Sequence, residues 1–150
     1  MNQNKYPIYY DRNKLSYEFL SLGPKGTIKK VIYFQKIGHN TFNLAYGDWD
    51  YSIQKFDDKA RTNNNDREKV LATVASAVIQ FFRSNKEAIV YAKASTPART
   101  RLYQMGISSN WHEINQILKV KGRVNGKWLP FEKNKNYEAF LARAKKTLYF

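Results

Sequence analysis

The residues from Ala94 to Tyr103 (Ala-Ser-Thr-Pro-Ala-Arg-Thr-Arg-Leu-Tyr) are of types that can hold a phosphate group. A hydroxyl residue followed by proline predicts that a helix starts here. The first turn of a helix has unpaired backbone N–H groups and a partial positive charge, and both favour an anion. Arg99 and Arg101 add planar donors that match phosphate oxygens, and no carboxylate stands in this turn to balance them. We therefore predict an anion site at this helix start.

The same residues also have a purely structural interpretation. Proline is common at the first position of helices, and Thr96 would then do no more than cap this one. The two arginines would pair with carboxylates elsewhere in the fold, at Asp48, Asp50 or Glu113.

A second basic segment begins at Lys119. Lys119, Lys121 and Arg123 alternate with apolar or small residues, so a strand would place all three on one face. Asn125-Gly126 predicts a tight hairpin, with Lys127 and Trp128 just across the turn. Cations and aromatic rings on such a ribbon can hold a nucleic-acid backbone and stack on bases. An exposed lysine face that discourages aggregation is the structural alternative.

Taken together, the two segments predict a surface for RNA or single strands. Its predicted residues are Lys93, Ser95, Thr96, Arg99, Arg101, Lys119, Lys121, Arg123, Lys127 and Trp128.

Catalysis is a second hypothesis, and the sequence leaves open whether the protein is an enzyme. In a metal-independent endoribonuclease, Arg99 and Arg101 would stabilise the charge of the phosphorane. Tyr103, His112 or Glu113 would move protons. No obvious acid–base pair stands out among these candidates, so binding alone is the preferred hypothesis.

The composition limits the metal and redox chemistry that the chain can perform. There is no cysteine, and His39 and His112 are the two histidines, which excludes disulfides, thiolate nucleophiles and cysteine-ligated zinc. Asp48, Asp50 and the pair Asp57-Asp58 could bind Mg²⁺, but Asp-x-Asp is also frequent in loops. We therefore predict neither a metal nor a cofactor.

The charge points to a polyanionic partner. The 150 residues carry a formal net charge of +14. Residues 76–150 hold 14 basic and 4 acidic side chains, against 12 and 8 in residues 1–75. Nucleic acid is the first partner to consider, and an acidic protein is the alternative.

The chain has no apolar run of transmembrane length and no signal peptide, so we expect a cytoplasmic protein with no membrane association. Its oligomeric state stays open.

The elements that must position these residues can be predicted along the chain. We expect one α+β domain over residues 1–150, with a curved, mostly antiparallel sheet and helices packed on one face. The expected strands are residues 15–22, 27–37, 41–46, 88–94, 119–124 and 127–131, with a long polar loop at 47–65 that has room for one short strand. The expected helices are residues 65–84, capped by Asn65 and Glu68, 97–106, closed by Gly106, a short one capped by Asn110, and 137–146.

Five stretches of the chain resemble a small bacterial family, found mostly among Bacteroidetes, that is catalogued as a domain of unknown function. They are residues 10–19 (YDRNKLSYEF), 47–50 (GDWD), 64–75 (NNDREKVLATVA), 95–103 (STPARTRLY) and 136–141 (NYEAFL). The resemblance covers nearly the whole chain and implies a single domain, but no activity, cofactor or catalytic residue. In size, charge and lack of cysteine, the chain also looks like the ribonuclease toxins of bacterial toxin–antitoxin pairs, with no shared motif.

Overall fold

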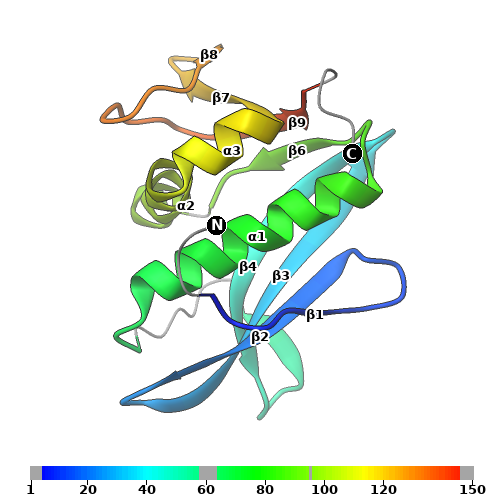
Figure 1. Ribbon diagram of the computed structural model, residues 1–150, viewed down its shortest axis with the longest axis vertical. Coiled ribbons are helices and arrows are strands. Elements are labelled where there is room, and N and C mark those ends of the chain that lie inside the picture. The colour runs from blue at the N-terminus through cyan, green and yellow to red at the C-terminus, as the bar shows by residue number, and fades with distance from the viewer. Residues whose placement is uncertain (1–4, 58–63, 95, 146–150) are drawn as a thin grey trace.

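A computed structural model describes residues 5–57, 64–94 and 96–145 (Figure 1). These residues form three helices and nine strands. The helices are α1 (Arg67–Ser84), α2 (Pro97–Ser109) and α3 (Trp111–Ile117). The strands are β1 (Tyr9–Tyr10), β2 (Ser16–Gly23), β3 (Gly26–Gly38), β4 (Thr41–Asp50), β5 (Lys55–Asp57), β6 (Ile89–Ala92), β7 (Leu118–Val124), β8 (Lys127–Pro130) and β9 (Phe140–Ala144).

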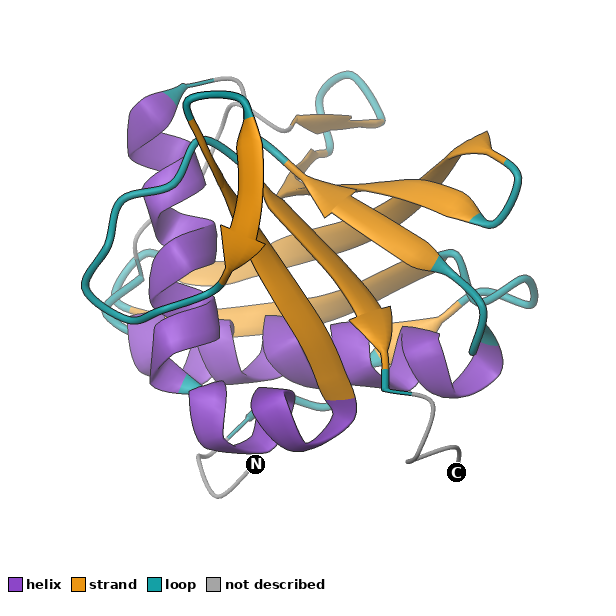
Figure 2. Ribbon diagram, turned by 90° about the horizontal axis from the view of Figure 1, so that it is seen from above, coloured by secondary structure: helices purple, strands orange, loops and turns teal. Residues whose placement is uncertain are grey.

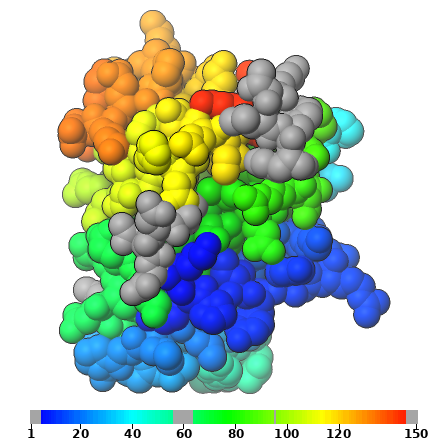
Figure 3. Space-filling view, viewed as in Figure 1, coloured from blue at the N-terminus to red at the C-terminus, as the bar shows by residue number. Residues whose placement is uncertain are grey.

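All nine strands belong to one open sheet. Its order is β1-β2-β3-β4-β6-β9-β7-β8, and β5 pairs with β4 beside this path. Every pairing is antiparallel except that of β4 with β6. The helices gather on one side of the strands (Figure 2). Seen from that side, α1 lies between the N-terminal strands and the pair α2 and α3 (Figure 3). The predicted class, a single α+β domain with a mostly antiparallel sheet, is confirmed.

Both predicted hairpins form where the turn residues stand. β2 and β3 pair without a break from Gly23 and Gly26 outward. β7 and β8 are joined by Asn125 and Gly126, whose φ angles of 50° and 76° both lie in the left-handed region. Such a two-residue turn matches the natural twist of two antiparallel strands, which explains the choice of Asn-Gly.

The main core lies between α1 and the strands β2 to β4. Tyr17 and Phe19 of β2 and Phe34 of β3 are fully buried there. The rings of Phe34 and Phe81 stack with their centroids 3.9 Å apart. These residues hold α1 against the sheet. The helices α2 and α3 also pack against α1.

The start of α1 differs from the prediction. The helix begins at Arg67 with Asp66, and not Asn65, as its N-cap, and Asn65 has a φ of 61° in the left-handed region. The carboxylate of Asp66 does not cap the helix. It accepts hydrogen bonds of 2.5 Å from the hydroxyls of Tyr6 and Ser21, which ties the helix start to the sheet. The Asp66 carboxylate thus makes tertiary contacts in place of a cap on its own helix.

The C-terminal segment is a correction of the predicted helix at residues 137–146. Residues Phe140–Ala144 form β9, which is inserted between β6 and β7. Phe140 and Ala144 are buried and Ala142 is partly buried, which is the period-two pattern of a strand. A second correction concerns Gly106, which lies inside α2 and does not end it.

The burial of Tyr17 in the main core has a testable consequence. Its hydroxyl is buried and makes no hydrogen bond to any residue that the structure describes. Burial raises the pKa of Tyr17 from 10.0 to about 12, with smaller contributions from Asp11 and Tyr10. We expect Tyr17→Phe to stabilise the protein at pH 7 by about 1 kcal/mol, because an unsatisfied buried donor is removed.

The same substitution should change the alkaline stability of the protein. Between pH 10 and 12 the unfolded chain loses the Tyr17 proton while the folded chain keeps it, so stability falls as pH rises. The Tyr17 contribution to this fall is about 2–3 kcal/mol, and it is absent in Tyr17→Phe. Urea unfolding at pH 7, 10 and 11.5 measures the difference between the two proteins. A difference that does not grow with pH would contradict the prediction.

Candidate functional site

The registers of β6, β9, β7 and β8 place their side chains on two faces of the sheet. Leu118 and Val120 face the helices, where they line a cavity. Successive residues of a strand point to opposite faces, so Lys119, Lys121 and Arg123 point to the face that none of the described helices covers. Their spacing therefore places them together, as the sequence predicts.

We call this surface the basic face. It comprises four cations and two aromatic residues: Lys119, Lys121, Arg123, Arg143, Tyr91 and Trp128. Arg143 of β9 lies directly opposite Lys119 of β7. Both side chains are exposed. Like charges directly opposite each other destabilise a sheet, and a bound anion would relieve this repulsion.

An aromatic pair lies beside these cations. The rings of Tyr91 and Trp128 meet edge to face, with their centroids 5.9 Å apart. They belong to β6 and β8, which β9 and β7 separate, so the two side chains reach toward each other over the basic face. The one carboxylate found near the four cations among the described residues is Glu138, 3.8 Å from Arg123. This distance is typical of a weak, exposed pair.

Sequence reasoning missed Tyr91 and Arg143. The sequence pattern predicts a helix at Arg143, and Tyr91 lies in a short strand whose neighbours in the sheet the sequence does not reveal. The alternation from Phe140 to Ala144 was the one signal that could have placed Arg143 on a strand face. Two predicted residues are less central than expected. Lys127 lies opposite Val124 at the hairpin tip, on the other side of the ribbon, and Lys93 is exposed just after β6.

The predicted helix start is present at α2. Thr96 is the N-cap, its hydroxyl accepts a hydrogen bond of 3.3 Å from the Arg99 backbone N–H, and Pro97 opens the helix. Ser95 lies outside the described residues. Since α2 packs on α1 and lines the cavity on the helix side, Arg99 and Arg101 come from an element on the opposite side of the sheet from the basic face. The two parts of the predicted surface, the start of α2 and the strand with Lys119, Lys121 and Arg123, therefore do not share one face.

The catalytic candidates lie in different surroundings. Tyr103 is half-buried and lines the cavity. His112 is exposed, with its ring 3.3 Å from the amide of Gln116. Glu113 is in the first turn of α3.

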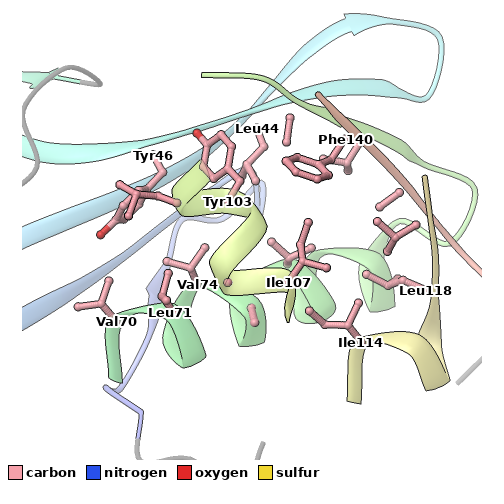
Figure 4. Close-up of a pocket in the computed structure, with 18 of the residues that line it drawn as sticks. Leu44, Tyr46, Val70, Leu71, Val74, Tyr103, Ile107, Ile114, Leu118 and Phe140 are labelled. Carbon is pink, nitrogen blue, oxygen red and sulfur yellow. The ribbon is translucent and has the colours of Figure 1, made fainter. Parts of the chain in front are cut away.

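A cavity of about 260 Å³ lies between the three helices and the helix side of the sheet (Figure 4). Side chains of α1 and α3 form its floor, Tyr103 and Ile107 come from α2, and Leu44, Tyr46 and Phe140 come from the strands. The cavity is partly open to solvent, and most of its lining is apolar.

Lys30 and Asp48 form a buried ion pair beside the cavity. They lie directly opposite each other on β3 and β4. Lys30 is 2% exposed, and its Nζ is 2.6 Å from Oδ1 of Asp48. The expected loop after Tyr46 is instead the second half of β4, and this extension brings Asp48 into register. Lys30 also lines the cavity. Sequence reasoning missed Lys30, because one lysine among many gives no signal of burial.

Asp48 is thus engaged by a lysine, and Asp50 accepts hydrogen bonds from the backbone N–H and hydroxyl of Ser52. Asp58 lies outside the described residues. Within the described ranges, no group of three or more metal-binding side chains is close enough to hold an ion. None of the helices described here is long and apolar enough to cross a membrane.

Comparison with known proteins gives one match. A family model described as "Family of unknown function (DUF6934)" matches residues 2–145. No curated protein and no solved structure matches the chain.

Proposed function

The chain belongs to this family of unknown function, DUF6934, and we propose that it binds nucleic acid on the basic face. RNA or single strands are the favoured ligands. The observation that carries the proposal is the cross-strand pair of Lys119 and Arg143 beside the rings of Tyr91 and Trp128. Cations on such a surface neutralise phosphates, and aromatic rings stack on unpaired bases.

The location of the site on a sheet surface favours single strands. A sheet surface presents its side chains outward over an area that several successive nucleotides can cover, as in other sheet-based binders of single-stranded RNA. Entry into the major groove of a duplex requires a helix or a protruding ribbon. The basic face instead spans β6, β9, β7 and β8 of one sheet.

Fluorescence anisotropy with labelled RNA and DNA oligomers tests the proposal. We expect binding at about 50 mM salt that weakens steeply as salt rises, with a log–log slope of roughly −3 for four phosphate contacts on a single strand. Single strands should bind more tightly than the matching duplex. Failure of every oligomer to bind would refute the proposal.

Charge reversal locates the binding surface. Lys119→Glu with Arg143→Glu should weaken binding by at least about tenfold, because two phosphate contacts become repulsive. The matched control is Lys36→Glu with Lys133→Glu, which changes the net charge equally at two exposed sites outside the basic face. Equal losses in the two double variants would mean that net charge alone attracts the oligomer, and would contradict a site on the basic face.

Two further outcomes would point to the other functions that the sequence suggests. Poly-glutamate that binds as tightly as RNA would favour an acidic protein partner. Cleavage of the RNA probe, lost in Arg99→Ala with Arg101→Ala, would favour a ribonuclease.

A further inference from the structure

We propose that the cavity beneath α2 is a binding site for a neutral, largely apolar small molecule. This site is on the helix side of the sheet, whereas the basic face is on the other side, so the two proposals stand or fall separately. Three features of the cavity support a ligand of this kind: its size, the exposure of the side chains around it and the balance of charge at its polar end.

The size of the cavity suits a small organic molecule. Its walls are almost entirely aliphatic or aromatic, with Val70, Leu71 and Val74 on one side and Leu44 and Phe140 on another (Figure 4). An apolar cavity of about 150 Å³ takes up benzene. The 260 Å³ found here therefore suits an apolar body roughly twice as large, such as a bicyclic aromatic or a chain of about ten carbons.

The burial of α2 also points to an occupant. A 13-residue helix normally buries an apolar stripe, yet Thr100 is the one buried residue of α2 among those described. Tyr103 and Ile107 point into the cavity but stay half-exposed (Figure 4). An apolar ligand would bury more of these two side chains, so α2 forms a loosely packed wall of the cavity.

The charge at the polar end favours a neutral ligand. The lining contains Lys30, Asp66 and Arg67. Lys30 is paired with Asp48 at 2.6 Å, and the carboxylate of Asp66 already accepts hydrogen bonds from two hydroxyls. Arg67 is exposed. A ligand charge buried beside Lys30 and Asp66 would therefore meet no uncompensated opposite charge, whereas one hydroxyl or carbonyl group is tolerated.

The test uses N-phenyl-1-naphthylamine, a neutral dye whose emission rises in apolar surroundings. We expect saturable binding of one dye per folded chain. In Val74→Phe the affinity should fall by at least about tenfold, because the added ring occupies the space of the dye. Val124→Phe is the matched control, since Val124 is half-buried against the core but does not line the cavity. It should bind the dye as the wild type does.

Circular dichroism and thermal unfolding establish that each variant is folded. If Val74→Phe does not fold, Ala142→Leu, on the strand wall of the same cavity, replaces it in the test. Dye binding that is not saturable in the wild type, or that is unchanged in a folded cavity-filling variant, would overturn the proposal.

Displacement of the dye tests the class of ligand. 1-Decanol should compete better than decanoate or decylamine, because only the alcohol enters without burying a charge. Stronger competition by either charged compound would overturn the assignment of a neutral ligand. Lys119→Glu with Arg143→Glu should bind the dye normally, which separates this site from the proposed nucleic-acid surface.

Discussion

Replacement of Lys30 by methionine is expected to lower the free energy of unfolding by about 3–5 kcal/mol. Methionine keeps the length of the side chain but removes its charge, which leaves the Asp48 carboxylate buried without its lysine. A buried charge that loses its ion-pair partner costs far more than the lost attraction between the two groups. Urea unfolding followed by circular dichroism measures the change.

The neighbouring lysine is the matched control. Lys29 lies on the other face of β3, where its Nζ is 3.0 Å from a carboxylate oxygen of Glu18 in a partly exposed pair. Lys29→Met should cost less than about 1 kcal/mol, because water screens such a pair. The difference between the two substitutions isolates the effect of burial.

A double substitution separates the buried charge from the packing. Lys30→Met with Asp48→Leu should be more stable than Lys30→Met alone, because removal of both charges removes the desolvation penalty. If the double variant is less stable than the single one, the ion pair is not the reason for the destabilisation. If Lys30→Met costs under 1 kcal/mol, the pair is less buried than its 2% exposure indicates.

Gly122→Ala is expected to destabilise the protein by about 2–3 kcal/mol. A Cβ atom at Gly122 would lie 2.2 Å from Cδ1 of Tyr137, far inside van der Waals contact. The ring cannot move away freely. Its centroid lies 5.5 Å from that of Phe131 and 5.8 Å from that of Phe140, and its hydroxyl accepts a hydrogen bond of 2.9 Å from the Glu132 backbone N–H.

Gly38→Ala is the control for this effect. Gly38 also lies in a strand, but a Cβ atom added there would be 3.8 Å from its nearest neighbour, the Cβ of Thr41. That substitution should be neutral within about 0.5 kcal/mol. In the pair Gly122→Ala with Tyr137→Leu, the loss should be smaller than the sum of the two single losses, since the smaller side chain relieves the overlap. Additive losses in thermal unfolding would show that the contact with the ring is not the cause.

Local signals in the sequence predict most of the fold. Asn125-Gly126 and the residues around Pro24 place both hairpins, and Thr96-Pro97 places the start of α2. In each case the deciding chemistry lies within a few residues: a left-handed turn residue, or a hydroxyl that caps the helix. The alternation from Lys119 to Arg123 likewise predicts a shared face, because the period of a strand is fixed.

The errors arise where distant residues decide the structure. Residues 137–146 have an amphipathic helical spacing, but the gap between β6 and β7 selects a strand, and only the sheet order reveals it. Arg143 and Tyr91 therefore join the basic face unpredicted. In the same way, Asp48 meets Lys30 only through the register of β3 and β4. Pairings between distant segments leave no mark in either segment alone.

The position of β9 leaves strand edges unpaired while the chain is being synthesised. Although β9 is the last of the strands that the structure describes, it occupies the interior of the sheet, hydrogen-bonded on both sides. Until residues 140–144 emerge, β6 and β7 each present an unpaired edge, and such edges recruit other chains. A nascent or truncated chain that lacks residues 140–144 thus exposes two unpaired strand edges, and the addition of β9 to the sheet protects the chain from aggregation.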